Sequence, residues 1–140
     1  MRRRRRTALL VTAAGIGIAV AGCGAEEFPN DPRPPAPVEL TAKVSDSRVV
    51  LSPVELDGKP VGAGLATVTI ANLTDEPTAL TFTGPEDATT DPIVANGTLD
   101  FKLDLQQGNY IVSADDEAVR PYEFQVGPER PSAQNDLLLP

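Results

Sequence analysis

The sequence predicts an all-β protein: a small antiparallel Greek-key β-sandwich that follows a signal peptide and a proline-rich tether. From residue 38 onward, apolar and polar residues alternate with a period of two in several short runs. Clusters of Gly, Pro, Asn and Asp separate these runs, and no window carries a sustained helical stripe. About seven short strands within residues 38–130 are typical of two packed antiparallel sheets.

Residues 1–22 have the features of an export signal. Arg2 to Arg6 form a basic segment, and Thr7 to Gly22 form a sixteen-residue, largely apolar stretch that ends in small residues. As a helix this stretch would span roughly 24 Å, which is short of a bilayer core of about 30 Å. We therefore expect a cleaved signal peptide rather than a permanent membrane span.

The signal ends in Val20, Ala21, Gly22 and Cys23. This run resembles the lipobox of bacterial lipoproteins, in which an aliphatic residue and two small residues precede the modified cysteine. The resemblance implies that Cys23 becomes the new N-terminus and is attached to membrane lipid through diacylglycerol and palmitate chains. Two or more such chains, at about 0.8 kcal/mol per buried CH₂, anchor a protein stably. The expected location is the extracytoplasmic face of the cell membrane.

The N-terminus leaves some alternatives open. A signal for soluble secretion with an incidental Cys23 is one, and a retained, uncleaved anchor is another. The export route is open as well, because the arginine run contains a pair, Arg5 and Arg6, that suits twin-arginine export while general secretion fits equally. A composition rich in Ala, Pro and Asp and poor in Lys favours a lipoprotein of the actinobacterial type.

Residues 23–37 comprise the lipidated cysteine and a tether. Gly24 to Pro37 contains five prolines in fourteen residues. Because proline fixes φ and lacks an N–H donor, we expect an extended segment without regular hydrogen bonding. At about 3.1 Å per residue it reaches on the order of 40 Å, enough to lift a domain clear of the lipid headgroups.

The domain itself, residues 38–130, contains the alternating runs. The expected strands are residues 38–44, 48–52, 66–72, 80–83, 98–105, 109–114 and 122–126. Asn72 to Pro77 predicts a turn, and longer turn regions are expected at 57–64, 84–92 and 115–121. Residues 106–108 predict a hairpin between 98–105 and 109–114. The run 98–105 directs four apolar side chains toward the core: Leu99, Phe101, Leu103 and Leu105.

Two segments resemble cupredoxin-like proteins. Gly64 to Asn72, followed after a loop by Ala79 to Phe82, looks like the strand–loop–strand unit of that family. Leu105 to Val112 resembles its L-x-P-G-x-Y-x-F segment, with Gln107 at the usual proline. The resemblance implies a cupredoxin-like fold over residues 64–126.

The same resemblance would place copper ligands at Thr78 or Ala79 and at Ala114, and none of these residues is His or Cys. A tyrosine after a glycine turn is also the tyrosine-corner pattern of immunoglobulin-like sandwiches. We therefore expect Tyr110 to be a structural hydrogen-bond donor rather than a ligand. The cupredoxin-like and immunoglobulin-like strand topologies both stay open.

The composition excludes several classes of function. The chain has no His and one Cys, which removes Ser–His and Cys–His nucleophilic pairs and any copper site built from imidazole and thiolate. We expect no enzymatic activity, no catalytic residue, no metal and no cofactor. Seven basic and twenty acidic residues follow Arg6, so that part of the chain has a formal charge of −13. Because such a body repels nucleic acid, no nucleic-acid partner is expected.

Two further features allow more than one interpretation. The acidic run of Asp115, Asp116 and Glu117 has carboxylates that Ca²⁺ accepts, but its spacing matches no calcium loop and favours a solvated surface. The C-terminal extension, residues 131–140, ends in Leu137 to Leu139 and Pro140, whereas a free tail is normally polar. We expect these leucines to fold back onto the domain, and a docking segment for a partner protein is the alternative.

Taken together, these features predict a membrane-anchored, extracytoplasmic lipoprotein that acts as a non-enzymatic binding or structural module of the cell envelope. Its expected partners are membrane lipid, through Cys23, and an envelope protein. The alternative is a small-ligand or metal-handling relative of the cupredoxins. Such a protein would be a copper-acquisition accessory or would bind a cation through carboxylates.

Overall fold

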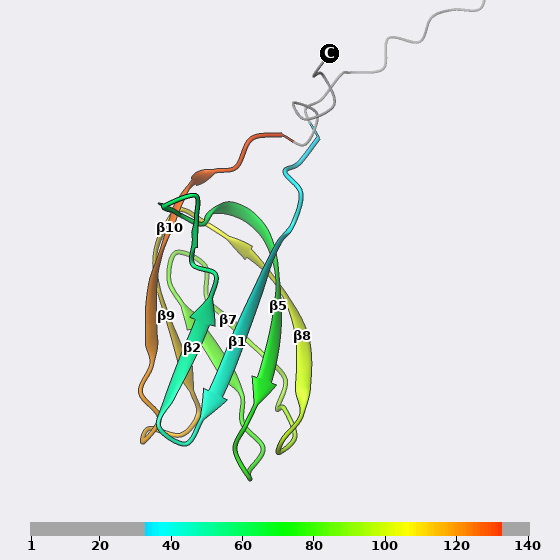
Figure 1. Ribbon diagram of the computed structural model, residues 1–140, viewed down its shortest axis with the longest axis vertical. Helices are drawn as coiled ribbons and strands as arrows, with labels where there is room; N and C mark the ends of the chain where they lie inside the picture. Colours follow the sequence, from blue (N-terminus) through cyan, green and yellow to red (C-terminus); the bar gives the residue numbers. More distant parts are fainter. Residues whose placement is uncertain (1–32, 133–140) are drawn as a thin grey trace, which may run out of the picture. The chain divides into compact units, whose positions relative to one another are not determined.

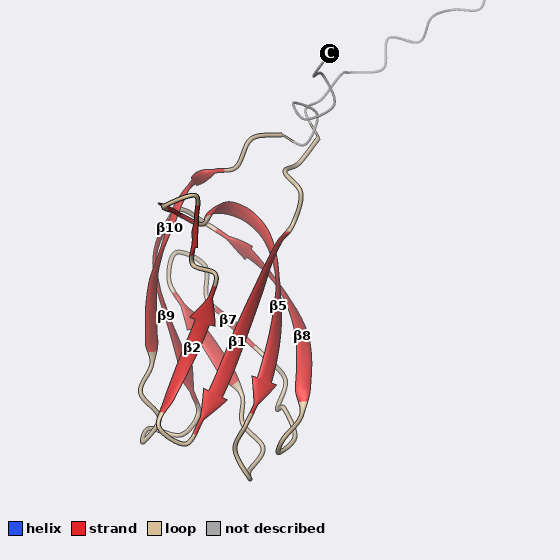
Figure 2. Cartoon of the chain, viewed as in Figure 1, coloured by secondary structure: helices blue, strands red, loops and turns tan. Residues whose placement is uncertain are grey.

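The computed structural model describes residues 33–132, which belong to one compact unit, Asp31–Pro140. These residues contain ten strands and no helix (Figure 2), so the predicted all-β class is confirmed for this part of the chain. No helix long and apolar enough to cross a membrane occurs within residues 33–132. The signal peptide, the lipobox with Cys23, most of the tether and the leucines at 137–139 lie outside the described residues.

Eight strands form one mixed sheet, and β3 and β4 form a separate hairpin (Figure 1). The strands are β1 (Val38–Ser45), β2 (Arg48–Ser52), β3 (Glu55–Leu56), β4 (Lys59–Pro60), β5 (Gly62–Asn72), β6 (Leu80–Thr83), β7 (Ala88–Thr89), β8 (Thr98–Leu105), β9 (Gly108–Ala114) and β10 (Tyr122–Glu129). Every predicted strand is present. The three strands that the sequence pattern missed have two residues each, too few to show a period.

The prediction of a purely antiparallel sheet is wrong. β1 runs parallel to β5, with Val38 opposite Ala66 and Val44 opposite Asn72. β10 is also parallel to the beginning of β5. Side chains alternate with the same period in parallel and antiparallel strands, so the pattern carries no information on direction. Parallel neighbours need a long connection, which residues 46–61 supply through β2 and the β3–β4 hairpin.

The predicted hairpin between residues 98–105 and 109–114 is wrong as well. β8 pairs with β5, whereas β9 pairs with β6 and β10. The connection therefore crosses from one part of the sheet to another. Leu105 and Tyr110, on its two sides, are both fully buried. The turn residues 106–108 are compatible with a hairpin and with a crossover. Burial of these two large side chains in the core favours the crossover.

β5 joins two groups of strands. Its first residues pair with β10, and from Gly64 onward it pairs with β8 and then β1. Gly64 has a φ of +123°, a conformation that L-residues rarely adopt. The change of partners separates a group of β2, β1, β5 and β8 from a group of β10, β9, β6 and β7.

Both groups contribute to a single core cluster. Phe82 of β6 stacks on Phe101 of β8 with ring centroids 5.9 Å apart. Of the four β8 side chains predicted to face the core, Leu103 and Leu105 are buried, and Leu99 and Phe101 are half-buried against it. The core thus connects strands that share no hydrogen bonds.

Candidate functional site

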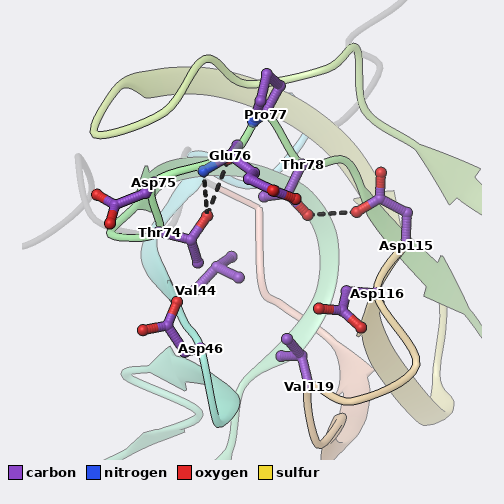
Figure 3. Close-up of a pocket in the computed structure, with 10 residues that line it drawn as sticks. All are labelled: Val44, Asp46, Thr74, Asp75, Glu76, Pro77, Thr78, Asp115, Asp116 and Val119. Atoms are coloured by element: carbon purple, nitrogen blue, oxygen red, sulfur yellow. Dashed lines mark hydrogen bonds between the residues drawn. The ribbon is translucent and has the colours of Figure 1, made fainter.

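Three loops meet at one end of the described domain and line an open cavity of about 510 Å³ (Figure 3). They connect β1 to β2, β5 to β6, and β9 to β10. We call this cavity the acidic hollow. Its lining residues are Val44, Asp46, Thr74, Asp75, Glu76, Pro77, Thr78, Asp115, Asp116 and Val119.

The hollow is strongly negative. Five of its lining residues are Asp or Glu, and none is Lys or Arg. Figure 3 shows Asp46 and Asp75 on one side and Asp115 and Asp116 on the other. The side chains of Val44 and Val119 are buried next to it. Carboxylates gathered in a concave surface concentrate negative potential, which attracts cationic groups.

One buried amide holds the loop between β5 and β6. The side chain of Asn72, fully buried at the end of β5, donates from Nδ2 to the carbonyl oxygens of Glu76 at 2.8 Å and of Ile93 and Val94 at 3.1 Å each. Its Oδ1 accepts from the Thr74 N–H at 3.0 Å and from the Thr74 hydroxyl at 2.8 Å. Sequence reasoning placed Asn72 at a turn and missed this role, because an Asn that ends a strand is equally typical of an exposed turn.

A second contact closes the other side of the hollow. The Thr78 hydroxyl donates to the Asp115 carboxylate, as Figure 3 shows, and the Asp115 N–H donates to the carbonyl of Ala79 at 3.2 Å. Ala114 lies opposite Leu80 in the ladder between β9 and β6. The positions at which the cupredoxin resemblance would place copper ligands are therefore neighbours in space, although none carries a copper-binding side chain.

The acidic run is only partly in the hollow. Asp115 and Asp116 line it, and Glu117 does not. The Asp116 carboxylate accepts a hydrogen bond from the Ala118 N–H at 2.8 Å, and a backbone bond from the Val119 N–H to the Asp116 carbonyl closes a turn rather than a helix. Within residues 33–132, no three Asp, Glu, His or Cys side chains are grouped so that they could hold a metal ion.

Sequence reasoning did not assign the remaining carboxylates of the hollow. Asp46, Asp75 and Glu76 come from loops that are distant in the sequence and meet only because their strands end on the same side. The sequence contained one indication of their role: each of these carboxylates lies in a short acidic loop that follows a run of alternating apolar and polar residues.

Tyr110 lies in the core, outside the hollow. It is fully buried, its ring stacks on Phe124 with centroids 5.5 Å apart, and its hydroxyl accepts a hydrogen bond from the Gln106 N–H at 3.0 Å. In this contact the residue predicted to be a donor is the acceptor. A Cβ atom on Gly84 would lie 2.5 Å from the ring, so glycine is needed there for the ring to fit.

The opposite end of the domain, where β1 begins, is held by one arginine. Arg130 donates from Nη1 to the carbonyl of Ala36, from Nη2 to that of Leu65 at 2.6 Å, and from Nε to that of Ala63 at 3.2 Å. Burial lowers the pKa of Arg130, and the negative charge of Asp104 acts in the opposite direction.

We call this the tether end. Here the Ser132 hydroxyl donates to the carbonyl of Arg33 at 2.7 Å, so the first and last described residues lie together. β1 runs from this end to Ser45, next to the hollow (Figure 1). The hollow is therefore on the side of the domain that faces away from the tether end.

In comparisons with known proteins, no protein family matches this chain, and no curated protein matches it.

Proposed function

We propose that this protein is a membrane-anchored, extracytoplasmic lipoprotein whose β domain is a non-enzymatic binding module of the cell envelope. Cys23, preceded by Val20, Ala21 and Gly22, is the lipid attachment site, and the proline-rich segment is the spacer. The observation that carries the proposal is the hydrogen bond from the Arg130 guanidinium to the Ala36 carbonyl. It holds Ala36, just before β1, at the end of the domain opposite the acidic hollow, and we expect the hollow to be the end that meets partners.

We further propose that the eight-stranded sheet is folded into a Greek-key β-sandwich. The stacking of Phe82 on Phe101 supports this arrangement, because the two rings belong to the two different groups of strands. The shared core also supports it, because both groups contribute buried side chains to one cluster. Two such layers are the usual way in which a sheet buries one face.

A binding role suits the chemistry of the chain better than catalysis. The absence of His removes the commonest general base. The buried polar side chains of the described domain also serve the fold: Asn72 and Thr78 hold loops, and the Thr90 hydroxyl accepts from the Leu80 N–H at 3.0 Å.

The anchor is tested by replacing Cys23 in the full-length chain expressed in a bacterial host. We expect the wild-type protein to incorporate labelled palmitate and to fractionate with membranes, and Cys23→Ser to lose both properties. Ser132→Ala is a matched control elsewhere in the chain and should keep both. Membrane association of the Cys23→Ser variant without label would contradict a lipid anchor and favour a retained signal segment.

The orientation is tested on the lipidated protein in vesicles that contain spin-labelled lipid. Paramagnetic broadening of amide signals should be stronger at the tether end, at Leu65 and Arg130, than at Asp75 and Asp116 in the hollow. Equal broadening at both ends would show that the domain tumbles freely on its tether. The opposite order would overturn the proposed direction.

The second candidate is a metal-handling relative of the cupredoxins. The hollow has five carboxylates that could attract a cation, but no three of them are grouped as metal ligands within residues 33–132. Calorimetric titration of the full chain with Ca²⁺ and with Cu²⁺ separates the two functions. Micromolar or tighter binding that is lost in a variant with Asp75→Asn and Asp116→Asn would support the metal-handling function. No heat of binding with either ion would leave the binding module as the better account.

A further inference from the structure

Two arginines are held side by side next to the loops that form the hollow. Arg48, the first residue of β2, lies opposite Arg120 in an isolated parallel bridge. The Val49 N–H donates to the Arg120 carbonyl at 2.9 Å, and the Arg120 N–H donates to the Ser47 carbonyl at 3.0 Å. Residues in register on adjacent strands are about 4.8 Å apart at Cα, so the backbone fixes two positive side chains as neighbours.

Both side chains are exposed, and both line one open cavity of about 450 Å³. The other lining residues are Val49, Val50, Pro121 and Tyr122. In the part of the chain that the structure describes, neither guanidinium has an ion-pair partner or accepting oxygen within bonding distance. Arg130, by contrast, has all of its described contacts with backbone carbonyls.

An unpaired basic pair is unexpected on this surface. The chain after Arg6 carries twenty acidic and seven basic residues, so carboxylate partners are abundant. Of the acidic residues nearest to the pair in sequence, Asp46 lines the hollow instead, and Glu117 and Glu123 line neither the hollow nor this cavity. Holding two like charges together is unfavourable unless an anion offsets them.

We propose that Arg48, Arg120 and Tyr122 form a binding site for a phosphate group. Guanidinium groups donate in a fork that matches phosphate oxygens bidentately, and two such groups offset the double charge of a phosphate monoester. A single carboxylate would leave one positive charge without a partner. The tyrosine ring and the exposed side chain of Val50 would contact the organic part of the ligand.

The site is remote from the tether end. The eight residues of β1 separate Val38 from the loop that precedes Arg48, which is roughly 26 Å at 3.3 Å per residue. A soluble phosphate monoester, a phosphomonoester end group of an envelope polymer and a phosphomonoester lipid headgroup share the required chemistry, and the competition experiments distinguish these sources. The proposal depends neither on the lipid anchor nor on the acidic hollow.

The test is an NMR titration of the uniformly ¹⁵N-labelled full-length chain in detergent against inorganic phosphate at constant ionic strength, with affinities taken from the backbone amide signals of Val49 and Tyr122. We expect saturable shifts of the Nε signals of Arg48 and Arg120. Arg48→Gln with Arg120→Gln should weaken binding at least about tenfold. The double lysine variant at the same positions should lose most of the affinity, because it keeps the charge and loses the fork.

The matched control removes the same charge from elsewhere on the described sheet, through Lys43→Gln with Lys102→Gln, and should bind as the wild type does. Competition by glycerol phosphate but not by phosphatidic acid vesicles would identify a soluble ester or a polymer end group. Competition by the vesicles would identify a headgroup. Equal shifts at Lys43, Lys102 and the arginine pair, or unchanged binding in the double glutamine variant, would overturn the proposal.

Discussion

The two ends of the domain use charge differently. At the tether end, the guanidinium of Arg130 contacts the carbonyls of Ala36, Ala63 and Leu65. At the other end, five carboxylates line the hollow and an arginine pair lies beside it. Asp75, Asp115 and Asp116 accept hydrogen bonds from uncharged groups, and none of the charges at this end has an ion-pair partner among the described residues. The buried polar contacts there come from a neutral side chain, Asn72.

The comparison distinguishes charged side chains that stabilise the fold from charged side chains that are available to bind a ligand. The guanidinium of Arg130 donates to three backbone carbonyls from two separate segments, so it contributes to stability. At the hollow end, the carboxylates of Asp46 and Glu76 and both guanidinium groups have no described partner, and the amide of Asn72 stabilises the neighbouring loops. Removing a residue from each end therefore tests which contacts belong to the fold.

The largest expected effect is that of Asn72→Ala, which we expect to lower the free energy of unfolding by about 2–4 kcal/mol. The substitution leaves the Ile93 carbonyl and its neighbours without their buried donor. Urea denaturation of the full-length chain measures the change. The exposed Asn109 on β9 is the control, and its replacement by Ala should have little effect. A small effect of Asn72→Ala would mean that contacts other than those of Asn72 stabilise the loops of the hollow.

The next effect concerns the tether end. Arg130→Gln should lower the free energy of unfolding by about 1–3 kcal/mol, because three carbonyls lose a charged donor at a partly exposed site. Hydrogen exchange should also rise at Ala36 and Leu65 more than at Asn72. Arg33→Gln is the control, since only the backbone carbonyl of Arg33 has a described contact. A uniform rise in exchange would show that Arg130 acts on the whole domain.

A smaller effect is expected at Tyr110, in the core of the domain. Tyr110→Phe removes one hydrogen bond to the Gln106 N–H and keeps the ring, so the expected loss is about 0.5–1.5 kcal/mol. Tyr122→Phe is the control, because its ring is only half-buried. Denaturant midpoints compare the two. A loss well above this range would mean that the ring has moved against Gly84 or Phe124.

The smallest effect is expected at the arginine pair. Arg48→Gln with Arg120→Gln should change the free energy of unfolding by no more than about 0.5 kcal/mol, because neither guanidinium has a described partner. Thermal unfolding at low and at high salt measures it. A clear loss of stability that salt abolishes would show that the arginine pair mainly offsets the negative charge of the acidic hollow. The two residues would then belong with the charged side chains that stabilise the fold.

Much of the local structure followed from residue pattern. The seven longer strands were predictable because alternation with a period of two is required wherever one face of a strand is buried. Among the carboxylates of the hollow, the sequence singled out Asp115 and Asp116 because they are adjacent. It could not assign Asp46, Asp75 or Glu76, which are scattered over distant loops. Nor could it show that Asn72 is buried, since burial depends on what packs above the turn.

The sequence by itself determined where the longer strands lie and that the domain has neither His nor Cys, because both follow from residue types and their spacing. Only the tertiary structure decided that β1 is parallel to β5, that β8 and β9 are not a hairpin, and that Arg48 lies beside Arg120. Strand direction and pairing depend on how separate apolar faces share one core. That choice is made by long-range packing, which no local pattern encodes.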